Sequence, residues 1–332
     1  MPPLFSVVVP TLGSESKLSP LLVALERQTL PRERFEVIVV FDGAEPASAI
    51  RGALEALGAR VVRLEARSGP PAARNRGAAL AGGEFLVSAD DDIVPEPDWL
   101  ERAAERIAAE PDLDVIEGAT VKPGGRPVRI RADESAQYIL CNLFVRRSLF
   151  ERIGGFHEGY YDPENGVFFR EDADLGYTLE RAGARVGREP RAVVTHPIEH
   201  PGFLDPLRWA RRYEMDALLA ARYPDLFRER IEVHVLGPFR IRRPVVRACF
   251  FHVVALVAAA AALLAGEARA AGWLALGALA ALAVVWSKWR FAPLKLPVVV
   301  LVPWVLVRAW AWGWVRARRF SARSRPGTRG AA

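Results

Sequence analysis

Segments with the pattern of β-strands alternate with segments of helical spacing along the first ninety residues of the chain. The strand-like segments are residues 5–9, 35–41, 60–64 and 84–88. The segments between them, at about 18–29, 47–57 and 72–81, space their apolar residues as an α-helix does. Chains with this alternation form largely parallel sheets covered by helices. We therefore expect a doubly wound, mostly parallel α/β sheet.

Polar residues follow three of the four expected strands directly. Pro10 and Thr11 follow the first strand, Asp42 follows the second, and the run from Asp90 to Asp92 follows the fourth. In sheets of this class, ligands bind at the carboxyl ends of the strands. We expect these residues to face one crevice.

Three consecutive carboxylates, Asp90, Asp91 and Asp92, end the fourth strand. Like charges this close oppose each other's ionisation, and a divalent cation removes the conflict. Carboxylate oxygens suit Mg²⁺ or Mn²⁺, which complete their shells with water and substrate phosphates. The alternative is a polar turn, because Asp is common in turns.

The net charge of +6 belongs to the end of the chain. From residue 268 to residue 332 there are 11 Lys or Arg and no acidic residue, which leaves 34 basic and 39 acidic residues before them. The larger N-terminal part is therefore slightly acidic, so we expect no nucleic acid as a partner. The basic end indicates contact with anionic lipid.

Two uncharged runs, residues 248–266 and 270–286, are each close to the ~20 residues that cross a bilayer core. Seven of the nine tryptophans fall between Trp273 and Trp314, as is typical of a membrane interface. We expect spans at about 245–266 and 270–286. Both flanks are basic, so the positive-inside rule predicts a multi-pass protein of the cell membrane whose N-terminal domain is cytoplasmic.

A third apolar stretch, residues 296–315, is interrupted by Arg308, Pro297 and Pro303. If it crossed the bilayer, the six arginines between residues 316 and 329 would lie outside, against the positive-inside rule. We interpret it as an interfacial or re-entrant helix followed by a basic tail at 316–332, with a third span as the alternative. The expected domains are therefore 1–230 and a membrane domain at 231–332, although a buried helical hairpin is another reading of the apolar runs.

Short motifs follow one another in a fixed order along residues 5–200. They are Val-Val-Val-Pro-Thr at 7–11, Val-Val-Phe-Asp-Gly at 39–43, Ala-Arg-Asn-Arg-Gly at 73–77, the aspartates at 90–92, Asn-Leu-Phe-Val-Arg-Arg at 142–147, Gly-Gly-Phe at 154–156 and Glu-Asp at 171–172. This ordered set resembles the family-2 glycosyltransferases. The resemblance implies a GT-A fold and an enzyme of the hexosyltransferase class that moves a sugar from a nucleotide diphosphate, usually with inversion. Membrane-anchored members of the family are common.

The resemblance also implies roles for individual residues. Asp90 and Asp92 match the family's DxD pair, of which the second is usually the direct metal ligand, while Asp91 orients the ribose or the metal's waters. Asp42 matches the contact with a uracil or guanine base, although the chain has Phe41 where family members often carry a second Asp. Arg74 matches the arginine near the diphosphate, and Pro10 with Thr11 completes the expected nucleotide-sugar site.

Two further residues complete the expected site. Asp172 matches the aspartate of the family's Glu-Asp motif and is expected to be the catalytic base, because a carboxylate within reach of the acceptor hydroxyl can take its proton. His196 is a candidate third metal ligand, since some GT-A enzymes add a histidine and a neutral imidazole is a common ligand. A structural role is the alternative for each, because acidic residues are favoured in the first turn of a helix and a lone histidine is often a core or surface residue.

The expected function is metal-dependent, inverting glycosyl transfer with Mg²⁺ or Mn²⁺. The donor is expected to be a nucleotide-diphosphate sugar of the UDP or GDP type. The acceptor is expected to lie at the lipid bilayer, as a polyprenyl phosphate, a glycolipid or a cell-surface polysaccharide of the cell envelope. A catalytically silent scaffold that binds nucleotide sugars is one alternative. A haloacid-dehalogenase-type phosphatase is another, because residues 90–94 fit its DxDx[TV] signature, which normally closes the first strand of that fold.

Overall fold

The computed structural model of the protein describes residues 2–127, 138–197, 202–236 and 239–323. The chain folds as two compact units, Met1–Glu199 and His200–Ala332. The division lies earlier in the chain than the boundary expected after residue 230. Its physical reason is that the helices α7 (Asp205–Arg211) and α8 (Glu214–Arg222) pack against α13 (Val302–Arg323), far along the chain in the second unit.

The first unit is built on one mixed sheet of nine strands in the described residues, with β7 as a side branch on β6 and the others in the order β3-β2-β1-β4-β8-β6-β11-β5. The strands are β1 (Phe5–Thr11), β2 (Phe35–Asp42), β3 (Arg60–Leu64), β4 (Phe85–Ser88), β5 (Val94–Pro95), β6 (Val115–Lys122), β7 (Arg126–Pro127), β8 (Leu143–Arg146) and β11 (Val186–Thr195). A separate two-stranded ribbon pairs β9 (Tyr161–Asp162) with β10 (Val167–Phe168). The four strands expected from the sequence are present, and β1 pairs in parallel with both β2 and β4.

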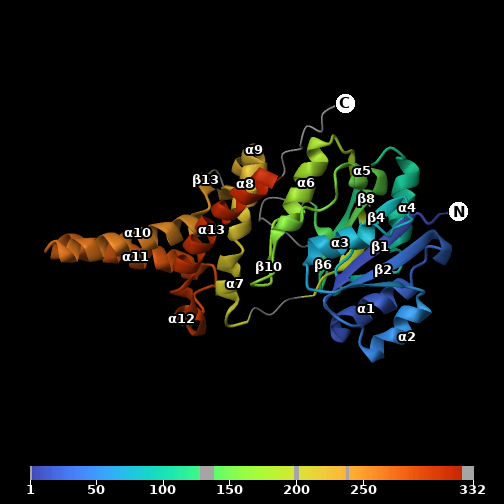
Figure 1. Ribbon diagram of the computed structural model, residues 1–332, viewed down its shortest axis with the longest axis horizontal. Helices are drawn as coiled ribbons and strands as arrows, with labels where there is room; N and C mark the ends of the chain where they lie inside the picture. Colours follow the sequence, from blue (N-terminus) through green and yellow to red (C-terminus); the bar gives the residue numbers. More distant parts are fainter. Residues whose placement is uncertain (1, 128–137, 198–201, 237–238, 324–332) are drawn as a thin grey trace. The chain divides into compact units, whose positions relative to one another are not determined.

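Helices cover both faces of the sheet (Figure 1). They are α1 (Glu15–Glu26), α2 (Ser48–Ala56), α3 (Pro70–Ala78), α4 (Trp99–Ala109), α5 (Arg147–Arg152) and α6 (Glu171–Arg181). Apolar side chains of α1, α2 and α4 pack in one core with alternate residues of β1, β2 and β4, among them Phe5, Val7 and Val39. The opposite face of the sheet packs with α5 and α6. The mostly parallel, doubly wound α/β sheet is therefore confirmed.

Strand β8 departs from the parallel pattern. It lies between β4 and β6 and runs antiparallel to both. Asn142, directly before it, is buried and accepts a hydrogen bond from Nε1 of Trp99 over 2.8 Å, while its own amide donates to the carbonyl oxygens of Ala119 and Ala192. These bonds tie α4, β6 and β11 to the start of β8. Both polar atoms of the buried Asn142 side chain are thereby hydrogen-bonded.

The second unit contains two long apolar helices, α10 (Pro244–Leu264) and α11 (Ala268–Ser287), at the two expected spans. Both are long and apolar enough to cross a membrane. They pack against each other, and His252 of α10 lies 2.8 Å from the carbonyl oxygen of Ala278 in α11. The two expected apolar helices are confirmed as helices of spanning length.

The segment expected to be interfacial or re-entrant forms two helices, α12 (Leu296–Val299) and α13, with a bend of 42° between the helical runs Pro293–Val299 and Val302–Arg318. Pro297 and Pro303 lie in the first turns of α12 and α13, where a missing N–H removes no helical hydrogen bond. If the bent pair is one span, the described residues contain three candidate spans. Part of the expected basic tail, residues 324–332, lies outside the described residues.

Shorter elements connect these helices. They are α9 (Pro224–Leu226), a π-helical turn at Phe227–Ile231, and the hairpin of β12 (Val233–Leu236) and β13 (Phe239–Arg242). Buried Asp216 of α8 pairs with Arg243 directly before α10, at 2.5 Å. Glu214 of α8 pairs with Arg316 of α13 at 2.8 Å. These two ion pairs connect α8 to the residue before α10 and to α13.

Candidate functional site

The turn after β4 carries three aspartates, Asp90, Asp91 and Asp92, which we call the aspartate turn. Each aspartate has a different partner. Nη2 of Arg74 donates to Oδ1 of Asp90 over 2.6 Å, Oγ1 of Thr11 donates to Oδ2 of Asp91 over 2.6 Å, and Nζ of Lys17 donates to Oδ2 of Asp92 over 2.8 Å. The partners come from the end of β1, the first turn of α1 and from α3. Because β1 and β4 are parallel neighbours, their carboxyl ends meet at this point.

Two of the aspartates lie close to a histidine. One potential ligand atom of each residue lies within 4.8 Å of the other two in the set Asp90, Asp92 and His196. Nε2 of His196 is 3.7 Å from Oδ1 of Asp92. Two carboxylates and an imidazole are a donor set that suits Mg²⁺ or Mn²⁺ with water and phosphate oxygens completing the shell. The residues present therefore fit a divalent cation, and they are the three that the sequence nominated as ligands.

The pairing of β5 with β11 brings His196 to the aspartate turn. Strand β5 follows the turn directly and runs antiparallel to the end of β11, with Thr195 opposite Val94. The backbone N–H of His196 donates to the carbonyl oxygen of Val121 over 2.8 Å, which fixes the residue after β11 to β6. A residue more than a hundred positions away in the chain thus lies beside Asp92.

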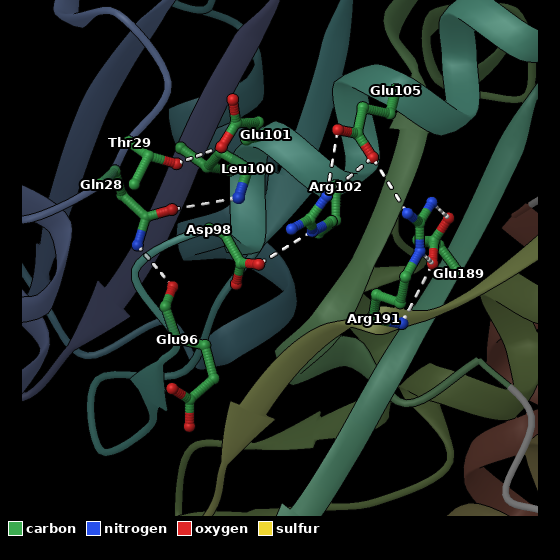
Figure 2. A network of polar contacts seen from close by, with 10 residues as sticks. All are labelled: Gln28, Thr29, Glu96, Asp98, Leu100, Glu101, Arg102, Glu105, Glu189 and Arg191. Atoms are coloured by element: carbon green, nitrogen blue, oxygen red, sulfur yellow. Dashed lines mark hydrogen bonds and ion pairs between the residues drawn. The ribbon is translucent and has the colours of Figure 1, made fainter.

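A polar network holds the segment that follows β5 against the residues directly after α1 (Figure 2). Gln28 donates from Nε2 to the carbonyl oxygen of Glu96 over 2.8 Å and accepts at Oε1 from the backbone N–H of Leu100 over 3.0 Å. Thr29 donates from Oγ1 to Glu101 over 2.6 Å. Since Glu96 in turn donates its N–H to Val193 of β11, this network supports the β5 and β11 pairing from one side.

The other half of the network in Figure 2 holds β11 against α4. The pairing of β11 with β6 shifts register between Glu189 and Val193, and Arg191 lies within that shift. Arg191 pairs with Glu189 at 2.9 Å and with Glu105 of α4 at 3.1 Å. Hydrogen bonds from Arg191 hold the pKa of Glu189 below its usual range. The irregular part of β11 is therefore pinned just before the residues that lead to His196.

Arg74 is the most deeply buried cation of the site, with 5% of its surface exposed. Only Nη2 is bonded, to Asp90, whereas Nε and Nη1 have no hydrogen-bond partner in the part of the chain that the structure describes. The guanidinium also lies over the ring of Phe156, 5.7 Å from its centroid. Unsatisfied buried donors are costly, and a guanidinium binds phosphate oxygens with paired N–H groups. These donors are therefore suited to an anionic ligand.

Asp42 lies at the end of β2 and is 4% exposed. Its Oδ1 accepts from the backbone N–H of Ser68 over 2.6 Å and its Oδ2 from that of Gly69 over 2.8 Å. Gly69 has a positive φ of 87°, and a Cβ there would meet the ring of Tyr161 at 2.2 Å. Asp42 therefore holds the loop that precedes α3. Pro10, the other residue expected at a strand end, lies within β1 opposite Val40.

The Glu-Asp motif begins α6. Glu171 is buried, and its pKa is raised to about 7, mainly by burial and also by the negative charges of Asp172 and Asp90, while Arg74 opposes the rise. The influence of Asp90 and Arg74 on Glu171 shows that the start of α6 lies near the aspartate turn. Asp172 is partly exposed, and its Oδ1 accepts from the backbone N–H of Ala173 over 2.7 Å. Its neighbour in the same helix turn, Asp174, is buried and accepts from the hydroxyl of Tyr160 over 2.9 Å.

Burial changes the acidity of the aspartate turn as well. It raises the pKa of Asp91, the charges of Asp92 and Asp90 add to the effect, and the hydrogen bond from Thr11 and the charge of Lys17 oppose it. Thr11 was expected to contact the nucleotide, and the structure shows it bonded to Asp91. Lys17 was not expected at the site, although it lies in the first turn of the helix after β1 and such turns meet the carboxyl edge of a parallel sheet.

Residues 6–175 match the family model described as Glycosyl transferase family 2. Glycosyltransferase AglE from Haloferax volcanii is 27% identical over 207 residues, which are 57% of this chain and 67% of that protein. Poly(ribitol-phosphate) beta-N-acetylglucosaminyltransferase TarS from Staphylococcus aureus is 32% identical over 142 residues, which are 42% of this chain and 25% of that protein.

A solved structure shares the fold. The crystal structure of S. aureus TarS residues 1–349 in complex with UDP superposes with a TM-score of 0.51 at 19% identity, covering 95% of this chain and 91% of the other. The family match includes the aspartate turn, Arg74 and Asp172 and ends before His196. The aspartates follow β4, the fourth strand in the chain and not the first, so the phosphatase signature is in the wrong place.

Proposed function

The chain belongs to glycosyl transferase family 2, and we propose that it transfers a sugar from a nucleotide diphosphate to an acceptor at a membrane, with inversion and with a divalent cation. The chain is a glycosyltransferase with a GT-A fold. One observation carries the finer proposal: the ligand atoms of Asp90, Asp92 and His196 converge within 4.8 Å beside the buried guanidinium of Arg74.

Asp92, Asp90 and His196 are the residues that would hold Mg²⁺ or Mn²⁺. When bound, such a cation stabilises the negative charge that grows on the leaving diphosphate. Arg74 is proposed to contribute to the same end, because Nε and Nη1 have no hydrogen-bond partner among the described residues and guanidinium groups bind phosphate oxygens. The burial of Arg74 strengthens this interaction, since few water molecules compete for the guanidinium.

The nucleotide is proposed to lie over the carboxyl ends of β1 and β2. Asp42 uses two of the four acceptor positions of its carboxylate for the loop at Ser68 and Gly69, which leaves acceptor positions for a base. Asp91 and Thr11 are proposed to contact the ribose side of the donor, with Pro10 beside them. Because the S. aureus TarS structure is a complex with UDP, a UDP-sugar is the first donor to test, with GDP-sugars second.

Asp172 is proposed as the catalytic base. The acceptor hydroxyl attacks the anomeric carbon, its proton passes to the Asp172 carboxylate, and the electrons of the broken C–O bond leave with the nucleotide diphosphate. Direct displacement of this kind inverts the anomeric configuration. Partial exposure of Asp172 leaves it open to an incoming acceptor, whereas buried Asp174 is bonded to Tyr160.

The acceptor is proposed to be membrane-associated, as a polyprenyl phosphate, a glycolipid or a cell-surface polysaccharide. Two helices of spanning length, α10 and α11, support this assignment. Basic residues on both sides of the pair support a cytoplasmic position for the glycosyltransferase unit in the cell membrane. The basic third helix, α13, is proposed to meet anionic headgroups at the same surface.

A donor screen tests the proposal. Full-length protein purified in detergent is incubated with individual UDP- and GDP-sugars and Mn²⁺ or Mg²⁺, and release of the nucleotide diphosphate is measured with and without EDTA. The expected result is turnover of one donor that EDTA abolishes and that a lipid or glycan acceptor accelerates. Tight binding of a nucleotide sugar without turnover by any acceptor class would instead favour the silent scaffold.

A further inference from the structure

Lys17 lies at the carboxylate that the proposed metal site needs most. Its side chain is 50% exposed, and Nζ donates to Oδ2 of Asp92 over 2.8 Å. The other oxygen of the same carboxylate, Oδ1, is 3.7 Å from Nε2 of His196. Asp92 itself is only 11% exposed in its side chain. The carboxylate of Asp92 therefore lies between the ammonium of Lys17 and the imidazole of His196.

The three side chains that donate to the aspartate turn differ in how firmly the fold holds them. Arg74 is 6% exposed in its side chain and is enclosed by the fold. Thr11 is buried, and its hydroxyl also accepts the backbone N–H of Gly13 over 3.0 Å. Lys17 is half exposed on a flexible four-carbon stem, so its ammonium is the least enclosed of the three donors. Of the three side chains, Lys17 can therefore leave its aspartate with the smallest change in the fold.

The ammonium of Lys17 and a divalent cation would compete for the same carboxylate, that of Asp92. Both seek the carboxylate of Asp92, and an ammonium 2.8 Å from Oδ2 places a unit positive charge where a dication would be repelled at close range. With the dication absent, the same ammonium relieves the repulsion between Asp92 and the two aspartates before it. Lys17 therefore stabilises the aspartate turn without a dication and opposes binding of the dication.

We propose that Lys17 is an internal competitor of the divalent cation: it neutralises Asp92 in the metal-free protein and must leave Asp92 when the cation binds. The inference rests on the proposed function, because it takes Asp92 as a metal ligand. Two consequences follow from it. Removal of the Lys17 charge tightens binding of the cation, and the same change destabilises the metal-free protein. If Lys17 merely tied α1 to the turn, its replacement would weaken cation binding and lower the stability of the metal-free protein together.

The test uses the full-length protein in detergent with Mn²⁺ alone as the probe, followed by electron paramagnetic resonance of the free ion. Lys17→Met keeps the length of the stem and removes the charge, whereas Lys17→Arg keeps the charge. Arg76→Met removes one exposed positive charge from α3 and serves as the matched control. We expect Lys17→Met to lower the Kd for Mn²⁺ about three- to fivefold, near the upper end of what loss of an exposed ion pair allows. Lys17→Arg and Arg76→Met should stay within about twofold of the wild type on the same scale.

A second measurement separates competition from a structural role. In EDTA the Lys17→Met variant should melt at a lower temperature than the wild type, and saturating Mn²⁺ should raise its melting temperature by more than it raises that of the wild type. Unchanged or weaker Mn²⁺ binding by Lys17→Met would overturn the inference, and if turnover of the wild type is still abolished by EDTA, the proposed function stands. If neither protein binds Mn²⁺ and wild-type turnover is unaffected by EDTA, the metal assignment fails and the inference fails with it.

Discussion

Nη2 of Arg74 donates to Oδ1 of Asp90 over 2.6 Å, and this bond joins the only deeply buried cation among the described residues of the site to the first residue of the aspartate turn. The remaining guanidinium nitrogens of Arg74 are buried without a partner in the described parts of the chain. One residue thereby both orders the turn and offers donors to a ligand. Arrangements of this kind are typical of sites that bind phosphate groups.

Arg74→Met should weaken donor binding more than it weakens folding. Loss of charge-assisted hydrogen bonds worth about 1.5–3 kcal/mol predicts a KM for the nucleotide sugar that rises roughly tenfold to a hundredfold. Initial rates across donor concentrations measure the change. Arg76→Met, two positions along α3 and exposed, is the matched control and should leave KM unaltered. Equal KM values for both variants would remove Arg74 from the donor site.

Asp172→Asn should slow transfer while leaving the donor bound. An amide cannot take the acceptor's proton, so kcat should fall by roughly 10²–10⁴, the usual contribution of a general base. Donor affinity, measured by binding of UDP or the active nucleotide in the presence of Mn²⁺, should stay close to that of the wild type. Equal losses of donor binding and turnover would show that Asp172 supports the site and does not act as the base.

The pKa of Glu171, raised by burial to about 7, predicts a pH dependence of stability. In the unfolded chain this carboxyl ionises near its ordinary value of 4.5, so between about 4.5 and 7 the folded state holds a proton that the unfolded state has lost. Stability from this group is therefore present below 4.5 and is lost as the pH rises toward 7. Melting temperatures of the wild type should fall relative to those of Glu171→Gln across this window. Parallel melting curves at all pH values would contradict the buried state of Glu171.

Gly77 allows α3, which carries Arg74, to lie close against β1. A Cβ at this position would meet Cγ1 of Val8 at 2.4 Å and Cγ2 of Val40 at 3.2 Å. Gly77→Ala should therefore cost about 1–3 kcal/mol of unfolding free energy, as overpacking commonly does. Gly52→Ala in α2 is the control, since a Cβ there meets no atom within 4 Å and alanine favours a helix. Thermal melts should show a loss for the first variant and no loss for the second.

Much of the first unit could be predicted because its strands are buried and its helices are amphipathic. Phe5, Val7 and Val9 alternate with Ser6 and Val8, and the runs at β2 and β4 are almost entirely apolar, so the patterns are strong. The direction of β8 could not be predicted, because Leu143 to Arg146 has the same pattern whether it runs parallel or antiparallel. The early boundary between the units was also hidden, since it depends on the packing of α7 and α8 with α13.

The site divides in a similar way. Asp90 and Thr11 could be brought together from the strand pattern, since the carboxyl ends of neighbouring parallel strands meet. Arg74 lies in α3, and only the family resemblance placed it with them. The place of His196 beside Asp92 depends on the short pairing of β5 with β11, which two residues of sequence do not signal. The ion pair between Lys17 and Asp92 depends on tertiary structure, and so does the burial of Glu171. A charged residue type in the sequence predicts neither of them.

Asp92→Asn is the sharpest test of the proposal that Asp92 holds a divalent cation for glycosyl transfer. Turnover of the active nucleotide sugar by the full-length protein is measured with Mn²⁺ or Mg²⁺ and with EDTA, alongside Asp112→Asn, which changes an exposed aspartate on the same unit. We expect Asp92→Asn to melt in EDTA at the temperature of the wild type and to lose metal-dependent turnover, while Asp112→Asn behaves as the wild type. Metal-dependent turnover at the wild-type rate in Asp92→Asn would show that Asp92 does not hold the cation.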